Sequence, residues 1–166
     1  MHESEVVRRS EALLQRLSME ASQVAERKMI MDNDSDPEIG NIREDWDLVG
    51  PALQEICDQF SYDWIPEDVY ASVSAGAATY FKTPAGFVIA RVYREEYSND
   101  RCFLIWIAYA YQKDLRLVFK YLPFFDKLAK EEGCTKLVTA TQADNLGKHL
   151  QNAGFGVQTT FYERSL

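Results

Sequence analysis

Three aspartates at alternate positions come closest, by spacing, to a metal-binding motif. Asp32, Asp34 and Asp36 match the opening of an EF-hand-type calcium loop, in which alternate carboxylates supply oxygen ligands. The sixth position of such a loop requires glycine for a sharp turn, and the last requires a bidentate glutamate. This chain has Pro37 and Arg43 at those positions. We therefore expect a solvated acidic linker here, and no metal site.

The other metal-ligating and nucleophilic residues are scattered. Cys57, Cys102 and Cys134 are far apart, and no Cys/His pair has zinc-ligand spacing. The sequence contains no Ser/His/Asp order, HExxH, GxSxG or Walker loop. His149 follows Lys148 on a polar stretch and is expected at the surface. The cysteines are expected to be reduced, buried thiols in a cytoplasmic protein.

Net charge excludes two classes of partner. The chain carries a formal charge of −8 and has a pI near 4.8. A protein without basic excess has no means of displacing the counterions of a nucleic acid or of binding an anionic membrane. The charged residues 3–9 argue against a signal peptide, and no apolar run reaches the length of a membrane span. We expect a cytoplasmic protein.

The N-terminal residues 3–29 have the pattern of an amphipathic helix. One narrow apolar stripe with helical spacing runs along it, made of Val6, Leu13, Leu17, Ala21 and Val24. Such a stripe suits docking rather than burial on all sides. We therefore expect these residues to bind a protein partner or to mediate self-association. The acidic stretch 31–41, with Pro37 and Gly40, reads as a hinge. The predicted division is an N-terminal helix and linker at 1–38 and a globular domain at 39–166.

The domain is predicted to begin with two helices and three strands. The helix Asp47–Gln59 is expected to turn one face inward, and a short helix follows at Pro66–Ala75. The inward residues are Leu48, Val49, Leu53, Ile56 and Phe60. Strands are expected at Ala78–Lys82, Phe87–Arg94 and Cys102–Tyr111. The last is almost continuously apolar, which is typical of a strand covered on both faces.

The final part of the chain has a strand–helix–strand pattern. A helix is expected over Leu115–Glu131, broken or kinked at Pro123, and then a strand over Thr135–Ala140. A short helix at Ala143–Asn152, a turn at Gly154–Phe155 and a final strand complete the order. A crossover long enough for a helix predicts that Cys102–Tyr111 and Thr135–Ala140 are parallel neighbours. The fold class is α/β (α+β), a mixed sheet with helices on both faces, preceded by an amphipathic helix.

This order, from Ile42 to Leu166, resembles the GNAT N-acyltransferase superfamily. The resemblance is carried by the strand Leu104–Tyr111, the loop Gln112–Leu117 with its following helix, and the segment Asn145–Phe155. More narrowly, the stretch AKEEGCTKLVTATQADNLGKHLQNAGFGVQTTFYER is similar to small acetyltransferase-like proteins of bacteriophages.

The resemblance implies acetyl-CoA as cofactor, bound where two central parallel strands separate. Its pyrophosphate would lie at a glycine-rich loop that starts a helix. The implied binding residues are Tyr111, Gln112, Lys113, Arg116 and Asn145. Here the two glycine positions of that loop hold leucines, at 115 and 117. An alternative explains the loop without a ligand, because Asp114 could be the N-cap of the helix.

The resemblance also implies a tyrosine acid and a base near the substrate amine. The family's helical tyrosine position is occupied by Gln151, so the candidate catalytic residues are Tyr109, Tyr162 and Glu96. Two functions remain open. One is a GNAT-fold binding or structural protein, associated with a virion, that has lost the cofactor. The other is an acetyl-CoA-dependent N-acyltransferase that acts on an amine.

Overall fold

The computed structural model describes residues 15–16, 18–22 and 35–166, and the chain forms two compact units, Met1–Ser35 and Asp36–Leu166. In the first unit, residues 15–16 and 18–22 are helical, and Arg16 pairs with Glu20 one turn later at 3.7 Å. The remainder of the predicted helix 3–29, and Asp32 and Asp34 of the acidic motif, lie outside the described residues. Everything below concerns the second unit.

A five-stranded mixed sheet forms the centre of this unit, with strand order β1-β2-β3-β4-β5. The strands are β1 (Glu38–Ile39), β2 (Thr79–Thr83), β3 (Gly86–Arg94), β4 (Arg101–Ala110) and β5 (Lys136–Thr139). The first four pair antiparallel, and β4 and β5 pair parallel. The predicted parallel neighbours are therefore confirmed.

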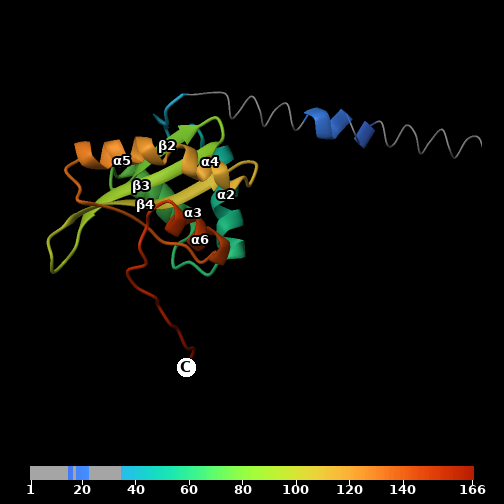
Figure 1. Cartoon of the computed structure of the whole chain (residues 1–166). Helices are drawn as coiled ribbons and strands as arrows, with labels where there is room; N and C mark the ends of the chain where they lie inside the picture. Colours follow the sequence, from blue (N-terminus) through green and yellow to red (C-terminus); the bar gives the residue numbers. More distant parts are fainter. Residues whose placement is uncertain (1–14, 17, 23–34) are drawn as a thin grey trace, which may run out of the picture. The chain divides into compact units, whose positions relative to one another are not determined.

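Helices cover both faces of the sheet, as predicted (Figure 1). The helices are α2 (Trp46–Gln59), α3 (Pro66–Ser74), α4 (Leu115–Lys120), α5 (Leu122–Glu131) and α6 (Asp144–Asn152). The predicted break near Pro123 is confirmed, because Tyr121 separates α4 from α5. Proline is tolerated in the first turn of α5, where its missing N–H would have no partner in any case.

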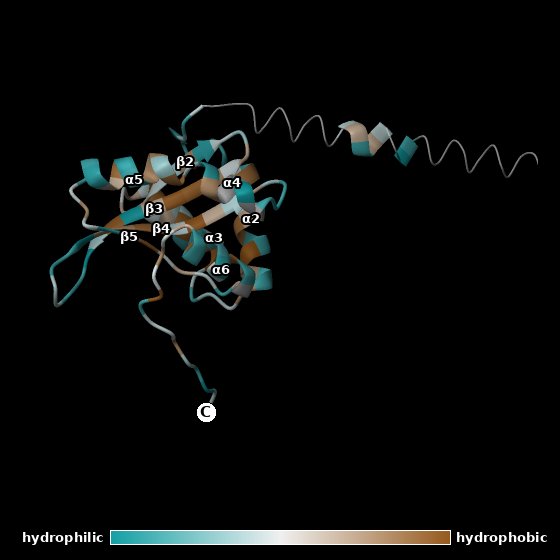
Figure 2. Ribbon diagram, in the orientation of Figure 1, coloured by the Kyte–Doolittle hydropathy of each residue, from teal (hydrophilic) through white to brown (hydrophobic). Residues whose placement is uncertain are grey.

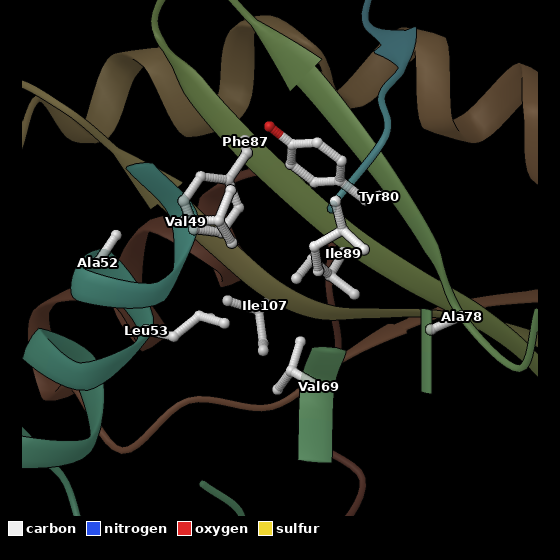
Figure 3. Packing of buried hydrophobic residues seen from close by; sticks show 10 residues of the cluster. Val49, Ala52, Leu53, Val69, Ala78, Tyr80, Phe87, Ile89 and Ile107 are labelled. Carbon is white, nitrogen blue, oxygen red and sulfur yellow. The ribbon is translucent and has the colours of Figure 1, made fainter. Parts of the chain in front are cut away.

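Two layers of apolar side chains hold these helices on the sheet. On one face, residues of α2 and α3 meet the inner sides of β2, β3 and β4, and nine of them are labelled in Figure 3: Val49, Ala52, Leu53, Val69, Ala78, Tyr80, Phe87, Ile89 and Ile107. On the other face, Phe125 of α5 packs edge-on against Phe81 and obliquely against Phe103. Figure 2 shows the same division, with apolar strands inside and polar helix surfaces outside.

Four details differ from the sequence-based predictions. The predicted final strand is wrong, since residues 156–166 form no strand and all are exposed. A β-rich sequence forms a strand only when another backbone pairs with it, and no described segment does so here. The strand β1 lies inside the predicted hinge, and the predicted boundary at 38–39 falls within it. A strand of two residues is too short to produce a detectable alternation of apolar and polar residues in the sequence.

The other two differences concern α2. The helix begins at Trp46, and its buried residues are Val49, Ala52 and Leu53. Leu48 was predicted to face inward but is 53% exposed. Successive residues are about 100° apart around a helix, so Leu48 lies beside the buried stripe that contains Val49 and not within it. Phe60 follows the last residue of the helix.

Candidate functional site

The carboxyl end of β4 is paired on one side only, among the described residues. The parallel ladder between β4 and β5 runs from Cys102–Lys136 to Ile105–Thr139 and stops there. Beyond that ladder, β4 continues through Trp106–Ala110. Among the described residues, this part of the strand pairs with β3 and with no other strand. The register between β3 and β4 shifts between Ile89 and Ala90, which leaves Trp106 opposite no single residue. This edge is where a ligand could meet exposed strand backbone in an open α/β sheet.

A hydrogen-bonded cluster lies at this end of β4. The hydroxyl of Tyr109 donates to Glu55 Oε2 of α2 at 2.6 Å. The ammonium of Lys113, in the turn after β4, lies 2.5 Å from Glu55 Oε1. The ring of Tyr109 stacks on Phe87 of β3 at 5.4 Å and meets Tyr111 edge-on at 6.1 Å. One carboxylate thus joins α2, β4 and the following turn.

These contacts shift two pKa values in opposite directions. The hydrogen bonds from Lys113 and then Tyr109 hold the pKa of Glu55 below its ordinary value. The same bond to the Glu55 carboxylate, together with burial, raises the pKa of Tyr109 to about 12. The pair therefore keeps its shared proton on the tyrosine at neutral pH. Sequence reasoning had named Tyr109 but missed Glu55, which lies on the flank of α2 outside the apolar stripe.

The Tyr109–Glu55 bond predicts a late-titrating tyrosine. Ordinary tyrosines ionise near pH 10, so in ultraviolet difference titrations Tyr109 should ionise about two pH units later. Because the folded-state pKa is raised, the stabilisation is complete below pH 10 and is lost as the pH rises through about 12. Glu55→Gln should move this step towards pH 10, whereas Tyr109→Phe should abolish it. A titration unchanged by Glu55→Gln would show that the bond is absent in solution.

The loop after β4 is organised as a helix cap. Asp114 is the N-cap of α4, and one of its carboxylate oxygens accepts from the backbone N–H of Arg116 at 3.0 Å. The guanidinium of Arg116 turns back onto the same carboxylate, with Nη2 at 2.7 Å from Oδ2 and Nε at 3.1 Å from Oδ1. The capping interpretation of this loop is confirmed.

This arrangement does not fit the pyrophosphate of a coenzyme. A phosphate at a helix start needs unoccupied backbone N–H groups and a positive environment. Here the Asp114 carboxylate already accepts from a backbone N–H and from Arg116, and it adds negative charge at the same point. Lys113 is paired with Glu55. The residues at the two glycine positions are leucines, which carry the side chains that glycine omits.

The structure separates the remaining predicted site residues. Tyr111 lies against Tyr109, and Gln112 follows it in the same turn. Asn145 lies in the first turn of α6, where its side-chain oxygen accepts from the N–H of Leu146 at 2.9 Å. Tyr162 is 93% exposed in the C-terminal segment. No described contact joins Asn145 or Tyr162 to Tyr109.

Glu96 lies at the opposite end of β4 from Tyr109. It belongs to the turn between β3 and β4, and the ten residues of β4 span roughly 33 Å at the usual strand rise. That turn has its own ion network, in which Lys136 of β5 lies 3.0 Å from Glu95 and 2.8 Å from Asp100. Glu96 therefore cannot act as a base at the carboxyl end of β4. The network instead fixes the start of β5 beside the β3–β4 turn.

A small hollow lies next to the same part of β4. It has a volume of about 20 Å³ and is lined by the β2–β3 turn, the start of β3, the end of β4 and Tyr121, with Gly86, Val88, Ala108 and Ala110 among the lining residues. The hydroxyl of Tyr121 is buried and lacks a partner among the described residues. A hollow of this size holds about one water molecule. It is far too small for a coenzyme.

Two other features are absent from the described residues. No group of three or more His, Cys, Asp or Glu side chains within that part of the chain is arranged to hold a metal ion. No helix there is both long and apolar enough to cross a membrane.

Comparison with known proteins identifies the fold. No family model and no curated protein matches the chain. Solved structures do match, and several of them are described as acetyltransferases. A putative acetyl transferase from Pyrococcus furiosus has a TM-score of 0.62 and 17% identity, over 79% of this chain and 100% of that one. A ribosomal-protein-alanine N-acetyltransferase from Brucella melitensis biovar Abortus 2308 has a TM-score of 0.59 and 17% identity, with the same coverage.

A plant enzyme extends the same comparison. Glucosamine-6-phosphate N-acetyltransferase from Arabidopsis thaliana has a TM-score of 0.56 and 9% identity, over 78% of this chain and 96% of that one. At these identities the likeness establishes the fold, and the fold does not by itself determine the activity. The chain has a GNAT-like acetyltransferase fold, as its sequence predicted.

Proposed function

We propose that this chain is a binding or structural protein built on the GNAT-like fold, and that it does not use acetyl-CoA. The observation that carries the proposal is the pairing of Asp114 with Arg116 at the start of α4. The carboxylate takes the place an anionic group of a ligand would need, and it neutralises the arginine that would hold that ligand. The missing glycines add a steric obstacle.

The partner that fits this proposal is a protein, or a second copy of the chain, bound through residues 3–29. The support is the narrow apolar stripe in the sequence and the acidic charge, which disfavours nucleic acid and membrane surfaces. The virion association that the phage resemblance implies, and a location in a host cytoplasm or virion, belong to the same proposal.

A second candidate function is supported by the cluster at the end of β4. Tyr109, Glu55 and Lys113 share hydrogen bonds beside the strand edge that has no partner. Such a cluster could bind an amine and hold or move one proton there. This favours an N-acyltransferase that acts on an amine and takes the acyl group from acetyl-CoA.

Calorimetry with acetyl-CoA distinguishes the two functions. At protein concentrations that report millimolar affinity, the wild-type chain is expected to give no heat of binding. The informative variant is Asp114→Asn, because asparagine is also a good N-cap but carries no charge. Heat in this variant alone would assign the block to the carboxylate. If neither the wild type nor Asp114→Asn gives heat, the leucines at positions 115 and 117 also prevent binding. Either result supports the proposal.

The enzyme hypothesis makes the opposite prediction. Heat in the wild-type titration, with binding weakened by roughly 1–2 kcal/mol in Arg116→Ala, would overturn the proposal, since that is the scale of a hydrogen bond to a charged group. Acetylation of amines by the wild-type chain, lost in Tyr109→Phe, would place the reaction at the end of β4. The matched control is Asp126→Asn, which removes the charge of an exposed side chain away from the loop.

A further inference from the structure

A tyrosine at the tip of the hairpin formed by β3 and β4 lies almost entirely in water. Tyr97 is 96% exposed and belongs to the turn 95–100, which projects from the end of the sheet (Figure 1). Among the described residues, its side chain makes no hydrogen bond and no ring contact. Tyr97 therefore contributes little to the packing of this unit, and its presence needs another explanation.

The turn that carries Tyr97 is held in one shape by its own bonds. The N–H of Glu95 donates to the carbonyl of Asp100 at 2.9 Å, and the N–H of Asn99 donates to the carbonyl of Glu95 at 3.1 Å. Lys136 of β5 binds both carboxylates, at 3.0 Å from Glu95 and 2.8 Å from Asp100. None of these bonds requires an aromatic residue at position 97. A side chain presented on a fixed backbone loses little entropy when it binds, which favours recognition by a partner.

The charges of this turn are balanced except at its tip. Lys136 pairs with Glu95 and Asp100, so these two carboxylates are already compensated. Arg94 is turned back onto the turn, where its Nη1 donates to the carbonyl of Asn99 at 3.2 Å. Glu96 is exposed and forms no ion pair within the part of the chain that the structure describes. A partner would therefore meet an aromatic ring and a free carboxylate on neighbouring residues.

We propose that Glu96 and Tyr97 bind a partner protein whose surface offers an apolar pocket with a lysine or arginine at its rim. Tyrosine is enriched among the residues that dominate protein interfaces, because its ring fills a pocket and its hydroxyl can form a hydrogen bond there. A cation at the rim would pair with Glu96 and fix the orientation of the tip. The formal charge of −8 favours such a basic partner and disfavours a second copy of the chain. The inference goes beyond the proposed function, which places the partner on residues 3–29, and it holds for either candidate activity.

The test compares the sedimentation of the fluorescently labelled full-length chain in buffer and in an extract of its source cells. The wild type is expected to sediment faster in the extract, bound to its partner. Tyr97→Ala should sediment as the free chain, because loss of an interface anchor weakens binding by roughly 30-fold or more. The matched control is Tyr162→Ala, which removes a tyrosine that is 93% exposed outside the hairpin and should behave as the wild type. Both variants should keep the thermal midpoint of the wild type.

Glu96→Gln tests the basic rim of the pocket, because it keeps the size of the side chain and removes its charge. This variant should bind more weakly than the wild type, and its remaining binding should depend less on salt, since the screened ion pair is gone. Glu131→Gln neutralises an exposed carboxylate on α5 and should change neither property. Equal binding by Glu96→Gln and the wild type would contradict a basic partner.

Nitration of tyrosine shows whether Tyr97 itself touches the partner. Tetranitromethane should modify Tyr97 readily in the free chain and only slowly in the complex isolated from the extract. A wild type that sediments alike in buffer and in extract overturns the proposal. A complex that Tyr97→Ala leaves intact, or one in which Tyr97 remains reactive, also overturns it and directs attention to residues 3–29.

Discussion

Leu53→Ala should lower the free energy of unfolding by about 2–5 kcal/mol, the usual cost of removing a leucine side chain from a packed core. Leu53 is completely buried in α2, where it faces Ile89 and Ile107 within the core cluster. Three carbons would be lost from a site enclosed by strands on one side and by α3 on the other, so little relaxation is available. Urea denaturation followed by circular dichroism measures the change.

Leu48→Ala is the matched control for this variant. It makes the same chemical change in the same helix, but Leu48 is 53% exposed. Its cost should be well under half that of Leu53→Ala. Equal losses in the two variants would show that α2 is rotated relative to the sheet and that the original sequence prediction for Leu48 was correct.

Gly86→Ala should also be strongly destabilising, by about 1–3 kcal/mol or more, the range found for overpacked sites. A β-carbon at Gly86 would lie 1.9 Å from the carbonyl oxygen of Tyr109 and 3.0 Å from the Cα of Ala110. Both are backbone atoms of β4, so neither can rotate away as a side chain would. The strands β3 and β4 would have to separate at the end that holds Tyr109.

The control here is Gly147→Ala in α6. Among the described residues, and apart from its chain neighbours and the backbone of its own helix, nothing lies within 4 Å of the position its β-carbon would take, and the residue is inside a helix. Alanine should therefore stabilise the protein by roughly 0.5–1 kcal/mol. Thermal unfolding of both variants, compared with the wild type, shows directly whether each substitution raises or lowers the stability. A neutral Gly86→Ala variant would mean that β3 and β4 are farther apart than described.

Much of this fold could be predicted from periodicity because its elements are long and their apolar patterns are strong. The strand β4 and the helices on either side of it are examples. The helix break at Tyr121 followed from a single proline. The N-cap at Asp114 could be predicted because a capping side chain bonds to a backbone N–H within the next three residues. The family resemblance indicated only that this loop starts a helix.

The errors have a common physical cause. A strand depends on a partner that the local sequence does not specify, which explains both the missed β1 and the unpaired residues 156–166. Glu55 was missed because its role depends on Tyr109, which lies 54 positions away in the chain. Glu96 was named as a candidate because it lies in a turn next to β4. The sequence does not show that this turn and Tyr109 lie at opposite ends of that strand.

The order of the strands has a consequence for how the molecule folds. Each strand pairs with the strand that precedes it in the chain, so most contacts in the sheet are local and loop closure costs little entropy. The β1–β2 and β4–β5 pairings are the exceptions, because α2 and α3 lie between β1 and β2 in the chain, and α4 and α5 lie between β4 and β5. The meander β2–β3–β4 can therefore assemble first, and the two outer strands, β1 and β5, join later. The strands that join later are also where local opening should be easiest, and both lie at the edges of the sheet.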